Sequence, residues 1–68
     1  MSVSALYTAT KNNEVICYGT NMDAFHKKLK LLEPMAKSQS YYLKLFKQER
    51  VTHFANAKRE IVVIQKLR

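Results

Sequence analysis

A chain of 68 residues with a single cysteine has to fold without an internal disulfide bond. Domains this short bury only about 60% of the surface that the unfolded chain exposes, so their core alone is marginal. Small scaffolds usually add disulfides, a bound metal or a second subunit. Because Cys17 stands alone and no metal-ligand spacing is visible, close packing or homodimerisation remains as support for one domain over residues 1–68.

The composition predicts a folded chain of the cell interior. Hydrophobic residues make up 47% of the sequence, with one glycine and one proline, which is not a disordered composition. The longest aliphatic run, Ile61 to Ile64, is far too short to span a bilayer. Residues 1–5 show neither the basic nor the apolar region of a signal peptide. We therefore expect a cytoplasmic protein with no membrane partner.

Strand-like patterns lie at both ends of the chain. Residues 3–9 alternate with a period of two, and residues 14–18 (EVICY) are rich in β-branched and aromatic side chains. The segment Lys11-Asn12-Asn13 between them predicts a tight turn, because asparagine tolerates the left-handed conformation. Residues 3–18 therefore predict a β-hairpin.

A second hairpin is predicted at the carboxyl end. Residues 51–55 (VTHFA) and 60–67 (EIVVIQKL) read as strands around residues 56–59, a turn that contains no glycine to define its type. The last strand is apolar on both faces from Ile61 to Ile64. This pattern is typical of a central strand that is covered on both sides.

A helix is predicted from about residue 20. Thr20 can cap its first amides, and Asp23 lies near its positive end. Apolar side chains then recur at three- and four-residue steps and share one face: Met22, Phe25, Leu29 and Leu32. Pro34 disfavours helix at the preceding residue, so this helix should end near Leu32.

Residues 38–48 (SQSYYLKLFKQ) fit two periods. As a strand, the segment would place Lys44 on the same side as two aromatic residues. As a helix, at about 100° per residue, it separates its apolar from its polar side chains cleanly. Ser38 also offers a cap, so we favour the helix.

These elements predict an α+β fold. We expect a small antiparallel sheet made by the N-terminal and C-terminal β-hairpins, with two short central helices packed on one face. The apolar side of each element should form the core: Leu6, Ile16, Phe25, Leu29, Leu32, Leu45, Phe46, Ile61 and Val63.

No catalytic arrangement emerges from the sequence. His26 and His53 are far apart and have no ligand at metal spacing. Cys17 reads as a small hydrophobic residue within a strand. A phosphate-binding loop needs several glycines, and Gly19 is the only one. We therefore expect no enzyme activity and no cofactor.

Positive charge is the strongest bulk signal. The net charge is +7. Residues 1–22 carry one basic and one acidic group, residues 23–50 carry seven against three, and residues 51–68 carry four against one. The excess therefore lies in the last two thirds of the chain. Such a field attracts phosphate backbones or acidic protein surfaces.

The helical interpretation of residues 38–48 gathers polar side chains on one exposed face. These are Lys37, Ser40, Lys44, Lys47 and Gln48. Such a face can contact phosphates and base edges in a major groove. The first helix adds Lys27 and Lys30, and the tip of the last hairpin adds Lys58 and Arg59. We therefore expect a small nucleic-acid-binding protein, for DNA rather than RNA, and a regulator in role.

In outline, residues 20–68 resemble a winged helix-turn-helix, in which two helices joined by a short bend precede a basic hairpin. The resemblance is one of layout. Pro34 stands where the bend usually has glycine, and the chain has no room for the usual third helix.

Three alternative functions remain open. A small inhibitor or adaptor of phage or plasmid type, acting on a host protein, is the alternative function, since edge strands can pair with a partner. The apolar face of the first helix also has the pattern of a membrane-surface helix, although a core role is favoured. A single-strand stacking platform is conceivable from Tyr41, Tyr42, Phe46 and Phe54, but aromatics at this spacing are usually core.

Overall fold

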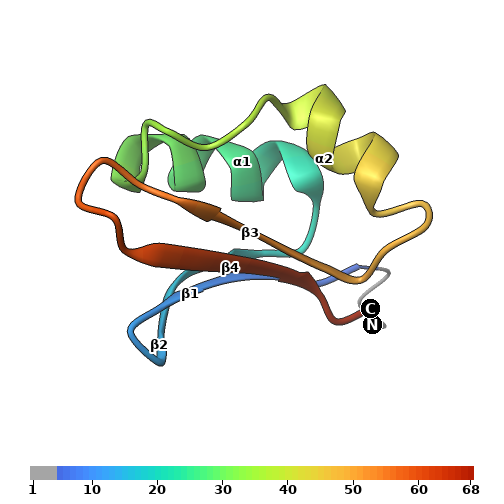
Figure 1. The fold of residues 1–68 in the computed structure, drawn as a ribbon. Coiled ribbons are helices and arrows are strands. Elements are labelled where there is room, and N and C mark those ends of the chain that lie inside the picture. The colour runs from blue at the N-terminus through green and yellow to red at the C-terminus, as the bar shows by residue number, and fades with distance from the viewer. Residues whose placement is uncertain (1–4) are drawn as a thin grey trace.

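A computed structural model describes residues 5–68 and has the predicted α+β fold (Figure 1). Residues 3 and 4 of the predicted first strand lie outside the described residues. The elements are β1 (Tyr7–Lys11), β2 (Glu14–Gly19), α1 (Met22–Leu32), α2 (Gln39–Leu45), β3 (Val51–Ala55) and β4 (Ile61–Lys66). All neighbouring strands are antiparallel, in the order β2-β1-β4-β3. Both helices lie on one face of this sheet, as predicted.

The two hairpins close by different means. Asn12 and Asn13 have φ angles of 53° and 65°. They supply the two left-handed residues that a two-residue hairpin turn needs. In the β3–β4 turn, Arg59 takes the left-handed position, with φ of 65°. Asn56 holds this turn, because its Oδ1 accepts hydrogen bonds from the amides of Lys58 and Glu60. An asparagine therefore stabilises a turn that has no glycine.

The helices begin at asparagine and serine caps. Asn21, and not Thr20 as predicted, caps α1, since its Oδ1 accepts from the Ala24 amide at 2.8 Å. The helix ends at Leu32, before Pro34, as predicted. Ser38 caps α2 by accepting from the Tyr41 amide, as expected. The helical interpretation is confirmed, although α2 ends at Leu45, earlier than residue 48. Within residues 5–68 neither helix is long and apolar enough to cross a bilayer.

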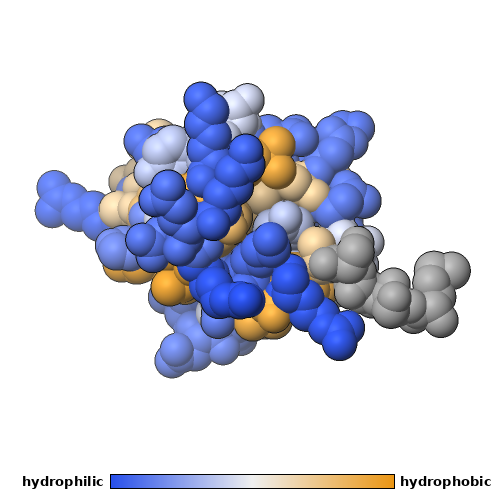
Figure 2. All heavy atoms as spheres, turned by 90° about the vertical axis from the view of Figure 1, so that its right-hand side faces the viewer, coloured by the Kyte–Doolittle hydropathy of each residue, from blue (hydrophilic) through white to orange (hydrophobic). Residues whose placement is uncertain are grey.

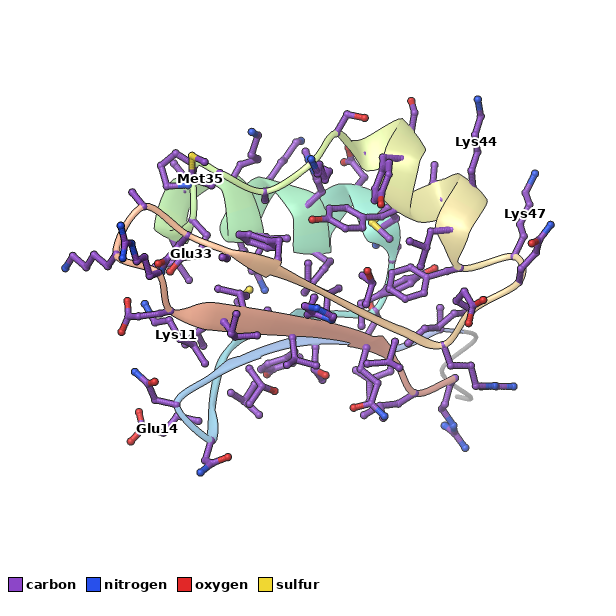
Figure 3. The ribbon with its side chains drawn as sticks, in the orientation of Figure 1. Lys11, Glu14, Glu33, Met35, Lys44 and Lys47 are labelled. Carbon is purple, nitrogen blue, oxygen red and sulfur yellow. The ribbon has the colours of Figure 1, made fainter. Side chains whose placement is uncertain are left out.

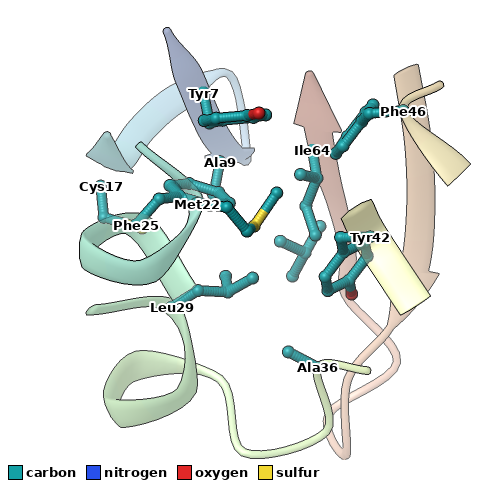
Figure 4. Packing of buried hydrophobic residues seen from close by; sticks show 11 residues of the cluster. Tyr7, Ala9, Cys17, Met22, Phe25, Leu29, Ala36, Tyr42, Phe46 and Ile64 are labelled. Carbon is teal, nitrogen blue, oxygen red and sulfur yellow. The ribbon is translucent and has the colours of Figure 1, made fainter. Parts of the chain in front are cut away.

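The core lies between the helices and the sheet (Figure 4). Aromatic rings occupy its centre: the centroid of Tyr7 lies 5.8 Å from that of Phe25 and 5.7 Å from that of Phe46. Gly19 lets α1 approach β2 closely, because a Cβ there would lie 2.8 Å from the Cβ of Phe25. The buried hydrophobic residues are Tyr7, Ala9, Cys17, Met22, Phe25, Leu29, Ala36, Tyr42, Phe46, Val62 and Ile64.

The predicted core is confirmed in part. Phe25, Leu29 and Phe46 are buried. Four further members are half-buried: Leu6, Ile16, Leu45 and Val63.

Two members of the predicted core are exposed. Leu32 is 53% exposed, because α1 ends there and its last turn leaves the core. Ile61 is 50% exposed, because Val62 and Ile64 face the helices instead. When both faces of a strand are apolar, the alternation of side chains does not indicate which face is buried. β4 is central in the sheet as expected, but between residues 5 and 68 only one of its faces is covered.

One end of the sheet is tied together by an ionic cluster of Lys11, Glu33 and Glu60, of which Figure 3 labels Lys11 and Glu33. The Lys11 Nζ lies 2.8 Å from the Glu33 carboxylate and 3.7 Å from that of Glu60. Glu60 also accepts hydrogen bonds from the side-chain amides of Asn12 and Asn56, both at 3.1 Å. The cluster therefore joins both hairpin turns to the end of α1. The hydrogen bond to Glu33 raises the pKa of Lys11.

Truncating two neighbouring leucines tests the packing of α1. Leu29 is fully buried, so Leu29→Ala should cost about 2–5 kcal/mol in the free energy of unfolding. Leu32→Ala should change it by only about 0.5 kcal/mol, because this side chain is already half in water. Urea unfolding of both variants measures the difference. Equal losses would contradict the packing described for the last turn of α1.

The ionic cluster predicts a loss of stability in acid. The hydrogen bonds from Asn56 and Asn12 lower the pKa of Glu60 below its usual 4.5. The carboxylate therefore contributes fully above that value, and its contribution is lost as the pH falls through the lower, folded-state pKa. Glu60→Gln should flatten the decline of the urea midpoint between neutral and acidic pH. Glu14→Gln is the matched control, because that exposed carboxylate has no hydrogen-bond or ion-pair partner within residues 5–68. An identical decline in Glu60→Gln and wild type would refute the role of this carboxylate.

Candidate nucleic-acid interface

Five cations gather at the end of the molecule opposite the Lys11 cluster; we call this set the basic end. It consists of Lys44, Lys47, Arg50, Lys66 and Arg68. Lys44 belongs to α2, and Lys47 lies in the turn that follows it. The Lys66 amide donates to the Arg50 carbonyl at 2.8 Å, so the start of β3 and the end of β4 are held together.

The cations of the basic end surround shared hollows. A polar hollow of about 280 Å³ is lined by Phe46, Lys47, Gln48, Glu49, Arg50, Lys66 and Arg68. Lys44 lines an adjoining hollow that also includes Gln48 and Glu49. Figure 2 views the molecule from this side and shows hydrophilic side chains projecting over most of it.

The basic end carries most of the net charge. Glu49 is its only acidic side chain, so five cations against one carboxylate give +4 of the total +7. Among residues 5–68, no ion pair involves any of these five cations. At the opposite end, the three cations Lys11, Lys58 and Arg59 are matched by the three carboxylates Glu14, Glu33 and Glu60, and Lys30 adds one further cation beside Pro34. The charge is therefore segregated along the molecule.

The structure brings together part of the predicted site. Lys44, Lys47 and Gln48 lie on or just after α2 and are exposed. Ser40 is exposed in the first turn of α2. Lys37 precedes α2, at the other end of the helix from Lys47. Its backbone is fixed, because its amide donates to the Tyr42 hydroxyl at 3.1 Å and its carbonyl lies 2.8 Å from His26 Nε2.

The tip of the C-terminal hairpin lies away from α2. Lys58 lines a hollow with Lys11 and Glu33, beside the end of α1. Figure 3 places Lys11 and Glu33 at one end of the molecule and Lys44 and Lys47 at the other. The predicted combination of second helix and hairpin tip is therefore not a continuous surface.

The two predicted cations of α1 have partners within the fold. Lys27 forms an exposed ion pair with Asp23, one turn earlier, at 3.4 Å. Lys30 donates to the carbonyls of Pro34 and Ala36 at 2.9 and 2.8 Å. Its ammonium group therefore holds the connection between the helices.

Sequence reasoning missed Arg50, Lys66 and Arg68. They flank the strands of the second hairpin, and their proximity follows from the pairing of Val51 with Gln65. The sequence could have shown that these three cations lie together only once the register of that hairpin was known.

The aromatic residues belong mainly to the core. Tyr42 and Phe46 are buried, and their ring centroids lie 6.3 Å apart. Burial also raises the pKa of Tyr42. Tyr41 is exposed and Phe54 is half-buried on the helix side. The core interpretation is therefore confirmed for Tyr42 and Phe46 and in part for Phe54, and it is wrong for Tyr41, which is left for contacts with a ligand.

The residues that could carry chemistry are separated. His26 lies on α1, whereas His53 points from β3 to the other face of the sheet. Burial raises the pKa of Cys17, which keeps it a thiol and lowers its reactivity. Within residues 5–68, no three His, Cys, Asp or Glu side chains are close enough to hold a metal ion.

Comparison with known proteins adds no further assignment. No protein-family model matches the chain. Neither a curated protein nor a solved structure shows significant similarity to it.

Proposed function

We propose that the protein binds nucleic acid through the basic end, as a small regulator in the cell interior. The observation that carries this proposal is the concentration of five cations with no ion-pair partner within residues 5–68. Four of them are exposed, and all except Lys44 line one hollow. Exposed cations of this kind attract phosphates and release counterions when phosphates bind. The opposite end, where cations and carboxylates nearly balance, gives no comparable attraction.

The side chains of the basic end suit phosphate contacts. Arg50 and Arg68 carry planar guanidinium groups that bind phosphate with two parallel hydrogen bonds. Lys44 adds a point charge on the exposed side of α2, and Lys47 adds one in the turn that follows. The C-terminal hairpin thus takes part through its base and not through its tip.

Duplex DNA is the favoured ligand. The major groove of B-form DNA admits a helix, whereas that of A-form RNA is too deep and narrow for side chains to read. Ser40 and Gln48 are polar and exposed near the lysines of α2, so they are the candidates for contacts with base edges.

Reversing two charges tests the site. Lys44→Glu/Lys47→Glu should weaken duplex binding by orders of magnitude, because two attractive charges become repulsive. In Ala variants, each phosphate-contacting cation that is lost should lower the slope of log affinity against log salt by about one. Fluorescence anisotropy with duplex DNA, single-stranded DNA and RNA at several salt concentrations measures both quantities.

The matched control is Lys27→Glu/Lys58→Glu, which changes the net charge equally but lies outside the basic end. It should keep most of the affinity. Equal weakening by the two double variants would disprove the site. If the wild type shows no salt-dependent binding to any nucleic acid, the functional class itself is wrong.

A protein partner is the second candidate, and a separate groove favours it. The groove, of about 610 Å³, lies between β2 and α1 and is lined by Val15, Ile16, Cys17, Tyr18, Lys28, Leu31 and Leu32. Leu31 is 85% exposed, and with Leu32, Val15 and Tyr18 it forms a contiguous apolar patch. Lys28 borders the groove, and its Nζ donates to the Tyr18 carbonyl at 3.2 Å. The groove would accept an apolar side chain of a protein that this chain inhibits or recruits.

A charged substitution in the groove distinguishes this alternative. A specific partner should be retained by the wild type after nuclease treatment and lost from Leu31→Glu. Leu43→Glu is the control, because Leu43 is also exposed but lies on α2. A partner that is released by nuclease, or retained by Leu31→Glu, would exclude the groove as its site.

A further inference from the structure

The face of the sheet that points away from the helices is open; we call it the outer sheet face. The strand register places its side chains in rows across all four strands. One row pairs Val15 with Thr10, Thr10 with Val63 and Val63 with His53. The whole face consists of Thr8, Thr10, Val15, Tyr18, Val51, His53, Ala55, Ile61, Val63 and Gln65. Between residues 5 and 68, no segment covers it (Figure 1).

The composition of the outer sheet face is unusual for a surface in water. Antiparallel sheets with one solvated face usually alternate apolar and polar residues, with the polar ones outside. Here the face has no Asp, Glu, Lys or Arg, in a chain that carries seventeen such residues. Val15, Tyr18, Val51 and Ile61 are each at least half exposed on it. The pattern is that of a sheet covered on both sides.

We infer that a second copy of this chain covers the outer sheet face, so that the protein is a homodimer. The argument rests first on charge. Two copies with a net charge of +7 repel each other wherever their cations meet, and this face is the part of the sheet without cations. Nucleic acid or an acidic protein would meet a cation only at its β2 edge, where the Lys28 Nζ lies 5.4 Å from the ring centroid of Tyr18. A second, identical uncharged face is complementary to it in chemistry.

Area and size support the same occupant. Strands lie about 4.8 Å apart and rise about 3.3 Å per residue, so these four strands present roughly 300 Å² in flat projection. Two such faces have a combined projected area of about 600 Å². Protruding side chains make the buried surface larger than this projection, toward the roughly 1,000 Å² of small specific interfaces. A chain with one cysteine and a small core also gains the extra burial that short domains need.

The inference is independent of the proposed nucleic-acid site. The outer sheet face and the basic end share no residue, so a dimer through the sheet leaves both basic ends free. The two interactions also respond oppositely to salt. Phosphate binding weakens as salt rises, whereas salt screens the repulsion between two basic copies and should strengthen their dimer.

Sedimentation equilibrium at pH 7.5 tests the inference. From about 10 to about 500 µM, the range expected for a small interface, the mass should rise from that of one 7.9 kDa chain to twice that value. The rise should occur at lower concentration in high salt. A mass of one chain throughout this range, at both low and high salt, overturns the inference.

Variants locate the interface. Val51→Lys and Ile61→Lys each place a cation on both copies of the outer sheet face, so each should raise the dissociation constant about tenfold or more. Both positions are half exposed, so the fold should survive, which circular dichroism verifies. Leu43→Lys is the matched control, since it adds the same charge at an exposed leucine of α2, outside the face. A dimer that survives both sheet variants, or that only Leu43→Lys dissociates, refutes the inference.

Discussion

β1 and β4 come from opposite ends of the chain and pair over five residues, from Tyr7 with Lys66 to Lys11 with Val62. This pairing closes a loop of about fifty residues, which costs entropy before any contact is gained. Burial of the core that the pairing creates offsets this loss of entropy. Ala9 and Ile64 are opposite each other in this ladder, and both are completely buried under the helices. Without the pairing of β1 with β4, the two hairpins would be isolated and each would be only marginally stable.

The same pairing segregates the charge. It brings the start of β1 next to the end of β4, where Lys66 and Arg68 meet the turn after α2. At the other end it brings Lys11 close to Glu60 and Glu33, which neutralise it. Residues that look evenly scattered along the last two thirds of the sequence therefore become one strongly basic end and one end whose charges nearly balance.

Local patterns in the sequence were enough to predict the elements, and long-range pairing was needed for the rest. The two asparagines of the first turn, Ser38 and Pro34 each act on their immediate neighbours, so the elements they bound could be predicted. The buried face of β4 could not, because Ile61 and Val62 are equally apolar and only contact with the helices distinguishes them. Of the five cations of the basic end, Lys44 and Lys47 were predicted. Arg50 and Lys66 could not be added, since sixteen positions separate them in the sequence and only the β3–β4 register joins them.

The nearly balanced charge at the end that holds Lys11, Glu33 and Glu60 has a kinetic consequence for the basic end. A molecule 38 Å long with most of its net charge at one end has an electric dipole as well as a net charge. A polyanion would exert a torque on it and turn it during approach, so that encounters begin with the basic end foremost. At physiological ionic strength the field decays over about 8 Å, much less than the length of the molecule. This orientation would therefore act only in the last step before contact, and it would shorten the search for a productive encounter without adding any contact to the complex.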